Sequence, residues 1–248
     1  NSGDRFAMFE NTCMEWMMAA QAAYHYNITL VTVYANLGDE ALASAFNETG
    51  VTSVLTNEDQ LPKFHALSKC IPTLKNVIYV SSAPLEASEE ELERRAQIIQ
   101  KLKDETPLNV ISFDEVEQLG SEQTEETAVQ PRERSTKDSL AIIMFTSGTT
   151  GDPKGVLIKH SNMLAAASAV SESAELTFSE WTYLAYLPLA HILESVAELI
   201  ILGNGGKIGY GTPRTLTDTG AKPCGDFAAV KPTLITGVPR IFDTIKKT

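Results

Sequence analysis

Apolar and polar residues alternate along the first 80 residues in a pattern that predicts short strands separated by helices. Strands are predicted where β-branched and aromatic side chains cluster, and helices where apolar side chains recur every three or four positions. The predicted strands are 5–9, 28–34, 51–55 and 77–80, and the predicted helices are 39–47, 59–68 and one that Asn11 or Thr12 caps and that ends near residue 25. This alternation favours an α/β fold, with helices on both faces of a parallel sheet.

The next segment, residues 86–137, is more acidic and polar. Ser88 and Glu91 have the Ser-x-x-Glu spacing of a capping box, which predicts the start of a surface helix. Glu91 and Arg95 are separated by one helical turn, so they form a stabilising pair on that helix. The elements predicted after it are a strand at 110–113 and an exposed loop at 120–137.

An unbroken apolar run at residues 140–145, LAIIMF, is typical of a strand that is buried on both faces. The stretch FTSGTTGDPKG, residues 145–155, continues directly from it. Short strands and helices then return. The predicted strands are 155–159, 183–187, 207–209 and 233–236, and the predicted helices are 161–171, 190–202 and one that begins near residue 239.

Composition and charge exclude several classes of protein. The chain has 248 residues, of which 43% are hydrophobic and 21% charged, as in ordinary globular domains. The net charge of −12 arises mostly between residues 86 and 126, where thirteen acidic residues outnumber four basic ones. Because no basic stripe is present, we expect no nucleic-acid partner. The three widely spaced cysteines, Cys13, Cys70 and Cys224, predict buried free thiols in a reducing compartment.

The stretch from 146 to 155 contains the residue types that hold phosphate: glycines, hydroxyl donors and one lysine. The candidate phosphate-binding residues are Thr146, Ser147, Gly148, Thr149, Thr150, Gly151 and Lys154. The stretch is not a Walker loop, because Pro153 and Gly155 replace the second glycine and the hydroxyl residue of that motif. A flexible surface loop is the alternative. The position directly after a buried strand favours binding, since open α/β sheets bind ligands at the carboxyl ends of their strands.

The segment TSGTTGDPKG, residues 146–155, resembles the signature of the adenylate-forming, or AMP-binding, superfamily. A second segment, YLPLAHILE at 186–194, resembles a block typical of long-chain acyl-CoA synthetases. Further segments resemble other blocks of the same subfamily: FEN and EW within 9–16, VTVY at 31–34, IGYG at 208–211, and KPT with GVPRIFD within 231–243. The resemblance covers almost the whole chain. It implies parallel-sheet αβαβα subdomains of the N-terminal domain of an adenylate-forming enzyme, present incompletely.

The resemblance also implies a reaction, that of a long-chain fatty acid–CoA ligase. In this reaction a fatty carboxylate attacks the α-phosphate of ATP, pyrophosphate leaves, and coenzyme A then takes the acyl group from AMP. ATP, Mg²⁺ and coenzyme A are the implied cofactors and co-substrates, and residues 146–155 are expected to hold the departing phosphates. The later family blocks and the small C-terminal lid domain are not in this sequence. We therefore expect a fragment of a longer protein that is inactive alone.

The resemblance places His191 beside the carboxyl group of the acyl-adenylate, where it would orient the fatty acid or donate to the phosphate. The alternative is a structural histidine at the start of a helix. Glu194, one turn later, either orients His191 or is an exposed helix acid. Arg240 is either at the rim of the site or a surface charge. Some bacterial relatives carry a gating tryptophan four residues after the histidine, where this chain has Ser195.

Other functions stay open from the sequence. One is a different adenylate-forming enzyme, such as an aryl-CoA ligase or a luciferase-like enzyme, and another is a nucleotide-binding fragment without catalysis. We expect an intracellular protein, either cytoplasmic or on the cytosolic face of the endoplasmic reticulum, a peroxisome or a mitochondrion. Any peripheral membrane association would involve regions outside this chain. The sequence does not indicate the preferred acyl chain length or the oligomeric state.

Overall fold

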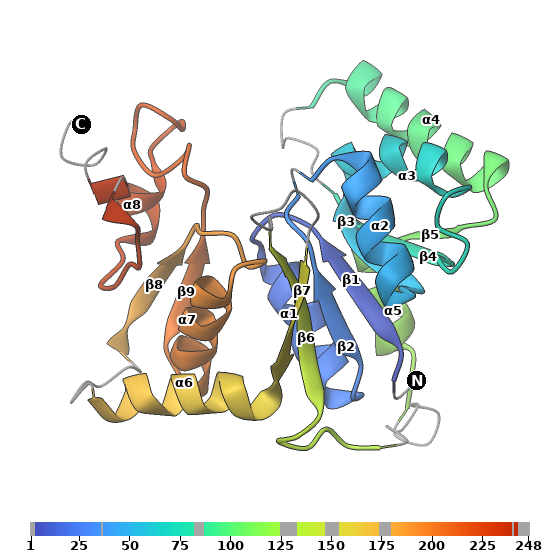
Figure 1. The fold of residues 1–248 in the computed structure, drawn as a ribbon. Helices are drawn as coiled ribbons and strands as arrows, with labels where there is room; N and C mark the ends of the chain where they lie inside the picture. The colour runs from blue at the N-terminus through green and yellow to red at the C-terminus, as the bar shows by residue number, and fades with distance from the viewer. Residues whose placement is uncertain are drawn as a thin grey trace. The chain divides into compact units, whose positions relative to one another are not determined.

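A computed structural model describes residues 3–35, 37–81, 87–124, 133–146, 154–173, 180–239 and 241–242. The chain divides into two compact units. The first consists of Asn1–Asn11 and Glu15–Lys159, and the second of Thr12–Met14 and His160–Thr248. Figure 1 shows the elements of both units in chain order.

A sheet forms the centre of the first unit, and its seven strands within the described residues have the order β5-β4-β3-β1-β2-β6-β7. The strands are β1 (Arg5–Phe9), β2 (Thr29–Thr32), β3 (Ser53–Asn57), β4 (Asn76–Val80), β5 (Asn109–Ser112), β6 (Leu140–Thr146) and β7 (Lys154–Lys159). The order β2-β1-β3-β4-β5 is that of flavodoxin-like sheets, which bind ligands at the switch point between β1 and β3. The predicted α/β class is confirmed.

Strand β7 differs from the predicted parallel arrangement. It pairs with β6 in the antiparallel sense, whereas β1 to β6 pair in parallel. The reason is the length of the connection: only residues 147–153 separate the two strands. Parallel neighbours need a crossover of a dozen residues or more.

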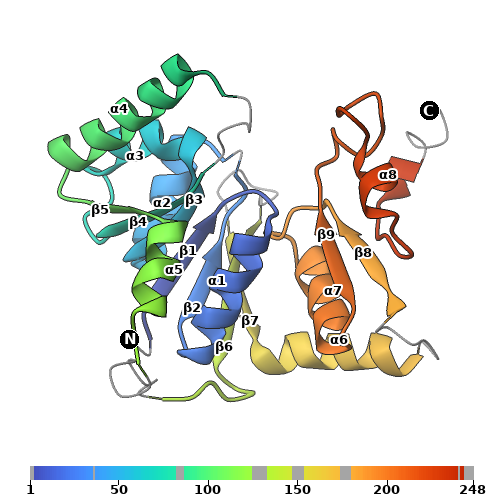
Figure 2. The ribbon, with the colours of Figure 1, turned by 180° about the vertical axis from the view of Figure 1, so that it is seen from behind.

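Helices cover both faces of this sheet, as predicted. They are α1 (Met14–His25), α2 (Asp39–Thr49), α3 (Leu61–Leu67), α4 (Glu89–Glu105) and α5 (Phe113–Ser121), with a short 3₁₀ turn η1 (Glu58–Gln60) before α3. Figures 1 and 2 show α2 and α3 on one face and α1 and α5 on the other, with α4 against α3. Strand β6 is buried along most of its length because both faces are covered.

Capping explains where two helices of this unit begin. Ser88 accepts the N–H of Glu91 at 3.2 Å, which is half of the predicted capping box, but the Glu91 carboxylate contacts Arg95. The predicted Glu91–Arg95 pair is therefore confirmed. A complete capping box forms instead between Ser112 and Glu115 at the start of α5. Helix α5 is not among the predicted elements, although the Ser112-x-x-Glu115 spacing is a local signal for its start.

The second unit contains two parallel strands within the described residues, β8 (Thr182–Ala185) and β9 (Lys207–Tyr210). Its helices are α6 (His160–Ser173), α7 (Ile192–Gly203) and α8 (Asp226–Val230). Successive residues of β8 face opposite sides, so Tyr183 packs with α7, and Leu184 packs near α8.

Two predictions for the second unit need correction. The strand predicted at 233–236 is reduced to one isolated bridge, between Tyr183 and Leu234. Helix α8 is absent from the sequence prediction because five residues are too few to show a helical period. Of the described helices, none combines the length and the apolar character that a membrane crossing requires.

Candidate functional site

The predicted phosphate loop connects the end of β6 to the start of β7. Thr146 ends β6 and Lys154 begins β7, and these two exposed residues are partners across the antiparallel ladder. The predicted residues Ser147, Gly148, Thr149, Thr150 and Gly151 lie outside the described residues, as does Arg240. Because β6 is parallel to β1–β5, its end lies at the carboxyl edge of the sheet. A hydroxyl and an ammonium group at this edge suit an anion such as phosphate.

Gly155, the last residue of the motif, has a packing role in the structure. A Cβ atom added there would lie 2.8 Å from Cγ2 of Ile143 and 3.4 Å from Cζ of Phe145. Non-bonded carbon atoms do not approach so closely in a packed interior. Glycine at this position therefore lets β7 lie against the buried side chains of β6, and the lack of a Walker-type hydroxyl residue has a structural cause.

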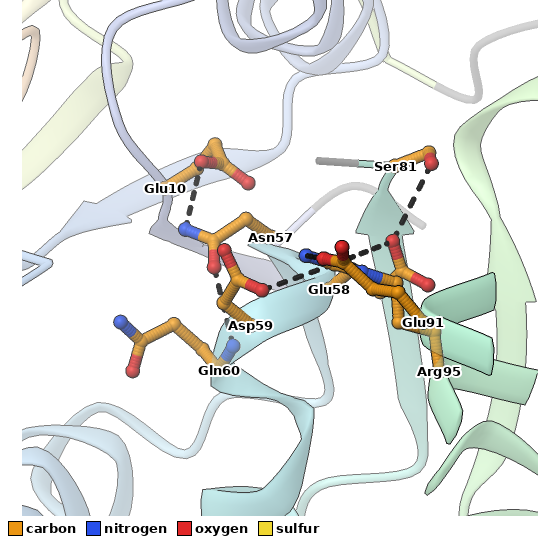
Figure 3. A network of polar contacts seen from close by, with 8 residues as sticks. All are labelled: Glu10, Asn57, Glu58, Asp59, Gln60, Ser81, Glu91 and Arg95. Carbon is orange, nitrogen blue, oxygen red and sulfur yellow. Dashed lines mark hydrogen bonds and ion pairs between the residues drawn. The ribbon is translucent and has the colours of Figure 1, made fainter. Parts of the chain in front are cut away.

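A buried carboxyl group lies at the switch point between β1 and β3. Glu10 follows β1, and its Oε1 accepts a hydrogen bond from Nδ2 of Asn57, the last residue of β3, at 3.0 Å (Figure 3). The N–H of Asn11 donates to the same oxygen at 2.6 Å. Burial raises the pKa of Glu10 to about 7 despite these two bonds, and the nearby Glu15 and Asp59 carboxylates add to the increase. Glu10 is not among the predicted site residues, because its burial depends on strands that are distant in the sequence.

The guanidinium of Arg95 lies among three carboxylates next to this carboxyl group. Arg95 comes from α4 and contacts Glu58 at 3.1 Å, Asp59 at 3.0 Å and Glu91 at 3.2 Å (Figure 3). The side chains of Arg95 and Glu58 are 12% and 8% exposed, so water weakens this pair less than an ordinary surface pair, whereas the Asp59 carboxylate is exposed. Because Glu58 and Asp59 directly follow β3, the contacts attach α4 to the carboxyl end of that strand.

In the second unit, His191 caps the N-terminus of α7. The ring atom Nδ1 accepts the backbone N–H of Leu193 at 3.2 Å. The backbone N–H of His191 donates to the carbonyl of Pro188 at 2.9 Å. In the neutral ring the proton is therefore on Nε2, since Nδ1 acts as an acceptor. The side chain is exposed. The structure thus contains the capping contact of the structural alternative, and it also leaves an N–H donor available to a ligand.

Glu194 is fully buried, so its interpretation as an exposed helix acid is wrong. Its Oε2 accepts from the hydroxyl of Tyr183 at 2.8 Å, and this hydroxyl also lies 2.5 Å from Oγ1 of Thr236. Burial raises the pKa of Glu194 to about 7, against the hydrogen bonds from Tyr183 and Thr236. These contacts point into the core of the unit. A catalytic role for Glu194 stays a prediction.

Two more polar residues of α7 are buried and were not predicted as functional. Glu198 accepts from the hydroxyl of Tyr210 at 2.8 Å. Burial raises its pKa to about 8, with a further increase from the charge of Glu194 one turn away. Ser195, at the position of the tryptophan gate of some relatives, donates to the carbonyl of Leu189 at 2.7 Å. Its exposed fraction is 2%, so this residue supports the turn before α7.

The described residues contain no group of three or more His, Cys, Asp or Glu side chains suited to hold a metal ion. The three cysteines are free thiols, as predicted, but none is buried: Cys70 is exposed, and Cys13 and Cys224 are half-buried. Lys154 lies in the first unit and offers an ammonium group, and His191 lies in the second unit and offers Nε2–H as a hydrogen-bond donor.

Comparisons with known proteins support the resemblance seen in the sequence. The chain is 40% identical over its whole length to long chain acyl-CoA synthetase 8 of Arabidopsis thaliana, and 36% identical to long-chain-fatty-acid–CoA ligase 1 of Schizosaccharomyces pombe. It spans 33% and 34% of the lengths of these two relatives.

A solved structure shows the same fold. The whole chain superposes on 34% of the adenylation and carrier didomain of carboxylic acid reductase from Segniliparus rugosus, with a TM-score of 0.79 and 18% identity. That protein was solved in complex with AMP. The predicted fold of an adenylate-forming N-terminal domain is therefore confirmed. A sequence model described as "AMP-binding enzyme" matches residues 1–248, and the chain therefore belongs to the family of AMP-binding enzymes.

Proposed function

We propose that this chain is part of a long-chain fatty acid–CoA ligase that forms AMP. The observation that carries the proposal is its identity of 36–40% with long-chain acyl-CoA synthetases along the whole chain. Since the chain spans about a third of those proteins, the activity belongs to the longer protein. The substrates are a long-chain fatty acid, ATP and coenzyme A.

In the first step, an oxygen of the fatty carboxylate attacks the α-phosphorus of ATP. The bond from this phosphorus to the β-phosphate oxygen breaks, and pyrophosphate leaves. Residues 146–155 hold the β- and γ-phosphates, with Thr146 as a hydrogen-bond donor and Lys154 as a positive charge at the edge of the sheet. This chemistry relies on positioning and charge neutralisation. Mg²⁺ would come with the phosphates of ATP and neutralise part of their charge.

In the second step, the thiol sulfur of coenzyme A attacks the acyl carbonyl carbon and loses its proton to water, and the bond from that carbon to the AMP oxygen breaks. His191 suits this centre, because the cap contact of Nδ1 makes Nε2–H the donor toward a carboxyl or phosphate oxygen. A fixed donor aimed at a developing negative charge stabilises a transition state. A cytoplasmic or membrane-face location, with membrane contact through other regions, stays a prediction.

The test is ATP–pyrophosphate exchange by the complete protein that contains this chain, with palmitate, with coumarate and without acid. We expect exchange with palmitate alone. The double variant Lys154→Ala, Thr149→Ala should lower it roughly 100-fold. Lys159→Ala is the matched control at the other end of β7, where the lysine forms a surface pair with Asp138 at 3.8 Å.

Two results would contradict the proposal. Exchange with coumarate instead of palmitate would indicate another adenylate-forming enzyme. A folded complete protein without exchange for either acid would favour a nucleotide-binding protein without this catalysis.

A further inference from the structure

A single hydroxyl group holds the turn that leads into the cap of α7. Oγ1 of Thr12 donates to the carbonyl of Leu187 at 2.5 Å, and it accepts the N–H of Leu189 at 2.9 Å. These two peptide groups lie on either side of Pro188. Thr12 is 175 positions away from Leu187 in the sequence, so the contact is a tertiary one.

The contact satisfies backbone groups that the turn leaves without partners of its own. Pro188 has no N–H, and residues 187–189 belong to neither β8 nor α7. Leu189 is 1% exposed, so an unpaired N–H there would be costly. One hydroxyl can donate once and accept at the same time, and Thr12 does both here.

The held turn is connected directly to His191. The carbonyl of Pro188 accepts the His191 N–H at 2.9 Å, and the carbonyl of Leu189 accepts Oγ of Ser195 at 2.7 Å. The N–H of Ser195 in turn donates to the carbonyl of His191 at 3.3 Å. Hydrogen bonds from Thr12 and from Ser195 therefore hold residues 187–189, which directly precede Ala190 and His191.

We propose that Thr12 is a positioning residue for His191: its hydroxyl fixes the peptide groups on both sides of Pro188, and thereby the backbone that carries the imidazole. The effect on activity rests on the proposed function. The hydrogen bonds themselves do not, so the two parts can be tested separately. A misplacement of about 1 Å at a reacting centre can lower a rate roughly 100-fold.

The experiment compares Thr12→Val, which keeps the shape and removes the hydroxyl, with Thr12→Ser, which keeps the hydroxyl. Thr219→Val is the control, because Thr219 is an exposed residue of the same unit. In the complete protein with palmitate, we expect Thr12→Val to lower kcat about 10- to 100-fold with little change in the KM for ATP. Thr12→Ser should recover most of kcat.

A double-mutant cycle identifies the route of the effect. If Thr12 acts through His191, Thr12→Val should lower kcat little further in a His191→Ala protein. If the losses in kcat caused by Thr12→Val and by His191→Ala simply multiply in the double variant, the positioning role is overturned. So would wild-type kcat in Thr12→Val.

Amide hydrogen exchange provides a readout that does not need activity. We expect faster exchange at Leu189 and His191 in Thr12→Val than in Thr12→Ser or Thr219→Val. Unchanged protection at Leu189 would overturn the proposed contact. If His191→Ala itself leaves kcat unchanged, the role of His191 under the proposed function fails, and the exchange data still decide whether Thr12 holds the turn.

Discussion

Replacing Glu198 by glutamine tests whether the fold keeps a buried carboxyl group of α7 neutral. Glu198 is fully buried, and its Oε1 has no hydrogen-bond partner in the described part of the chain. Burial raises its pKa to about 8, and the charge of Glu194 adds to this. A glutamine keeps an oxygen acceptor for Tyr210 but cannot ionise. The variant therefore imitates the protonated state at every pH.

The direction and size of the effect follow from proton binding. Between pH 4.5 and about 8 the folded protein holds a proton on Glu198 that the unfolded chain has released. The free energy of unfolding therefore falls as the pH rises through this range, and the contribution of the proton is lost above the folded-state pKa. A pKa change from 4.5 to about 8 corresponds to about 5 kcal/mol. Relative to wild type, Glu198→Gln should gain up to this amount between about pH 5 and about pH 9.

The assay is urea unfolding at several pH values, followed by the fluorescence of Trp181 in a Trp16→Phe background. Trp181 packs against the apolar cluster beneath α7, so its signal reports the unit that contains Glu198. Glu172→Gln on α6 is the matched control, because Glu172 is exposed. It should leave the pH dependence of unfolding unchanged.

The result that would refute the reasoning is an equal pH dependence in Glu198→Gln and wild type. It would mean that Glu198 is already ionised in the folded protein at neutral pH, despite its burial. A flattened dependence in the Glu172→Gln control as well would show that the effect does not depend on burial.

Two further predictions concern packing and ion pairing. Gly209→Ala would place a Cβ 2.7 Å from both methyl carbons of Val230. We therefore expect the free energy of unfolding to fall by about 1–3 kcal/mol, measured by thermal unfolding, and to recover in part when Val230→Ala is added. An unchanged Tm in the single variant would contradict this. Arg95→Gln leaves Glu58 without its cation, so we expect about 2–4 kcal/mol of destabilisation and faster hydrogen exchange in α4. Arg94→Gln, exposed on the same helix, should change little, and equal effects of the two would argue against the cluster.

Local sequence was enough to predict most of the elements and the family. Strands such as β1 and β6 are visible as apolar runs, because a strand buried on both faces needs apolar side chains at every position. The position of the motif at 146–155 directly after a buried strand favours a ligand loop over a flexible surface loop, since open α/β sheets bind ligands at the carboxyl ends of their strands, and this stays a prediction. Capping spacing was less reliable. Ser88-x-x-Glu91 forms half a box because Arg95 engages the glutamate.

Parts of the candidate site depend on contacts between distant segments, which the sequence does not display. Glu194 and Glu198 are charged residues, and only the packing of α7 against β8 and β9 shows that they face the interior. Glu10 and Asn57 are 47 positions apart and meet because β1 and β3 are neighbours in the sheet.

The α/β class, the order of most elements and the two motifs that resemble the family, at 146–155 and 186–194, follow from the sequence alone. These properties are encoded in residues close together in the chain, through side-chain period and local backbone chemistry. The burial of the carboxyl groups of α7 and the hydrogen bonds of Thr12 to the turn before His191 are visible only in the tertiary structure. Both depend on packing between segments far apart in sequence, and local side-chain patterns carry no record of such contacts.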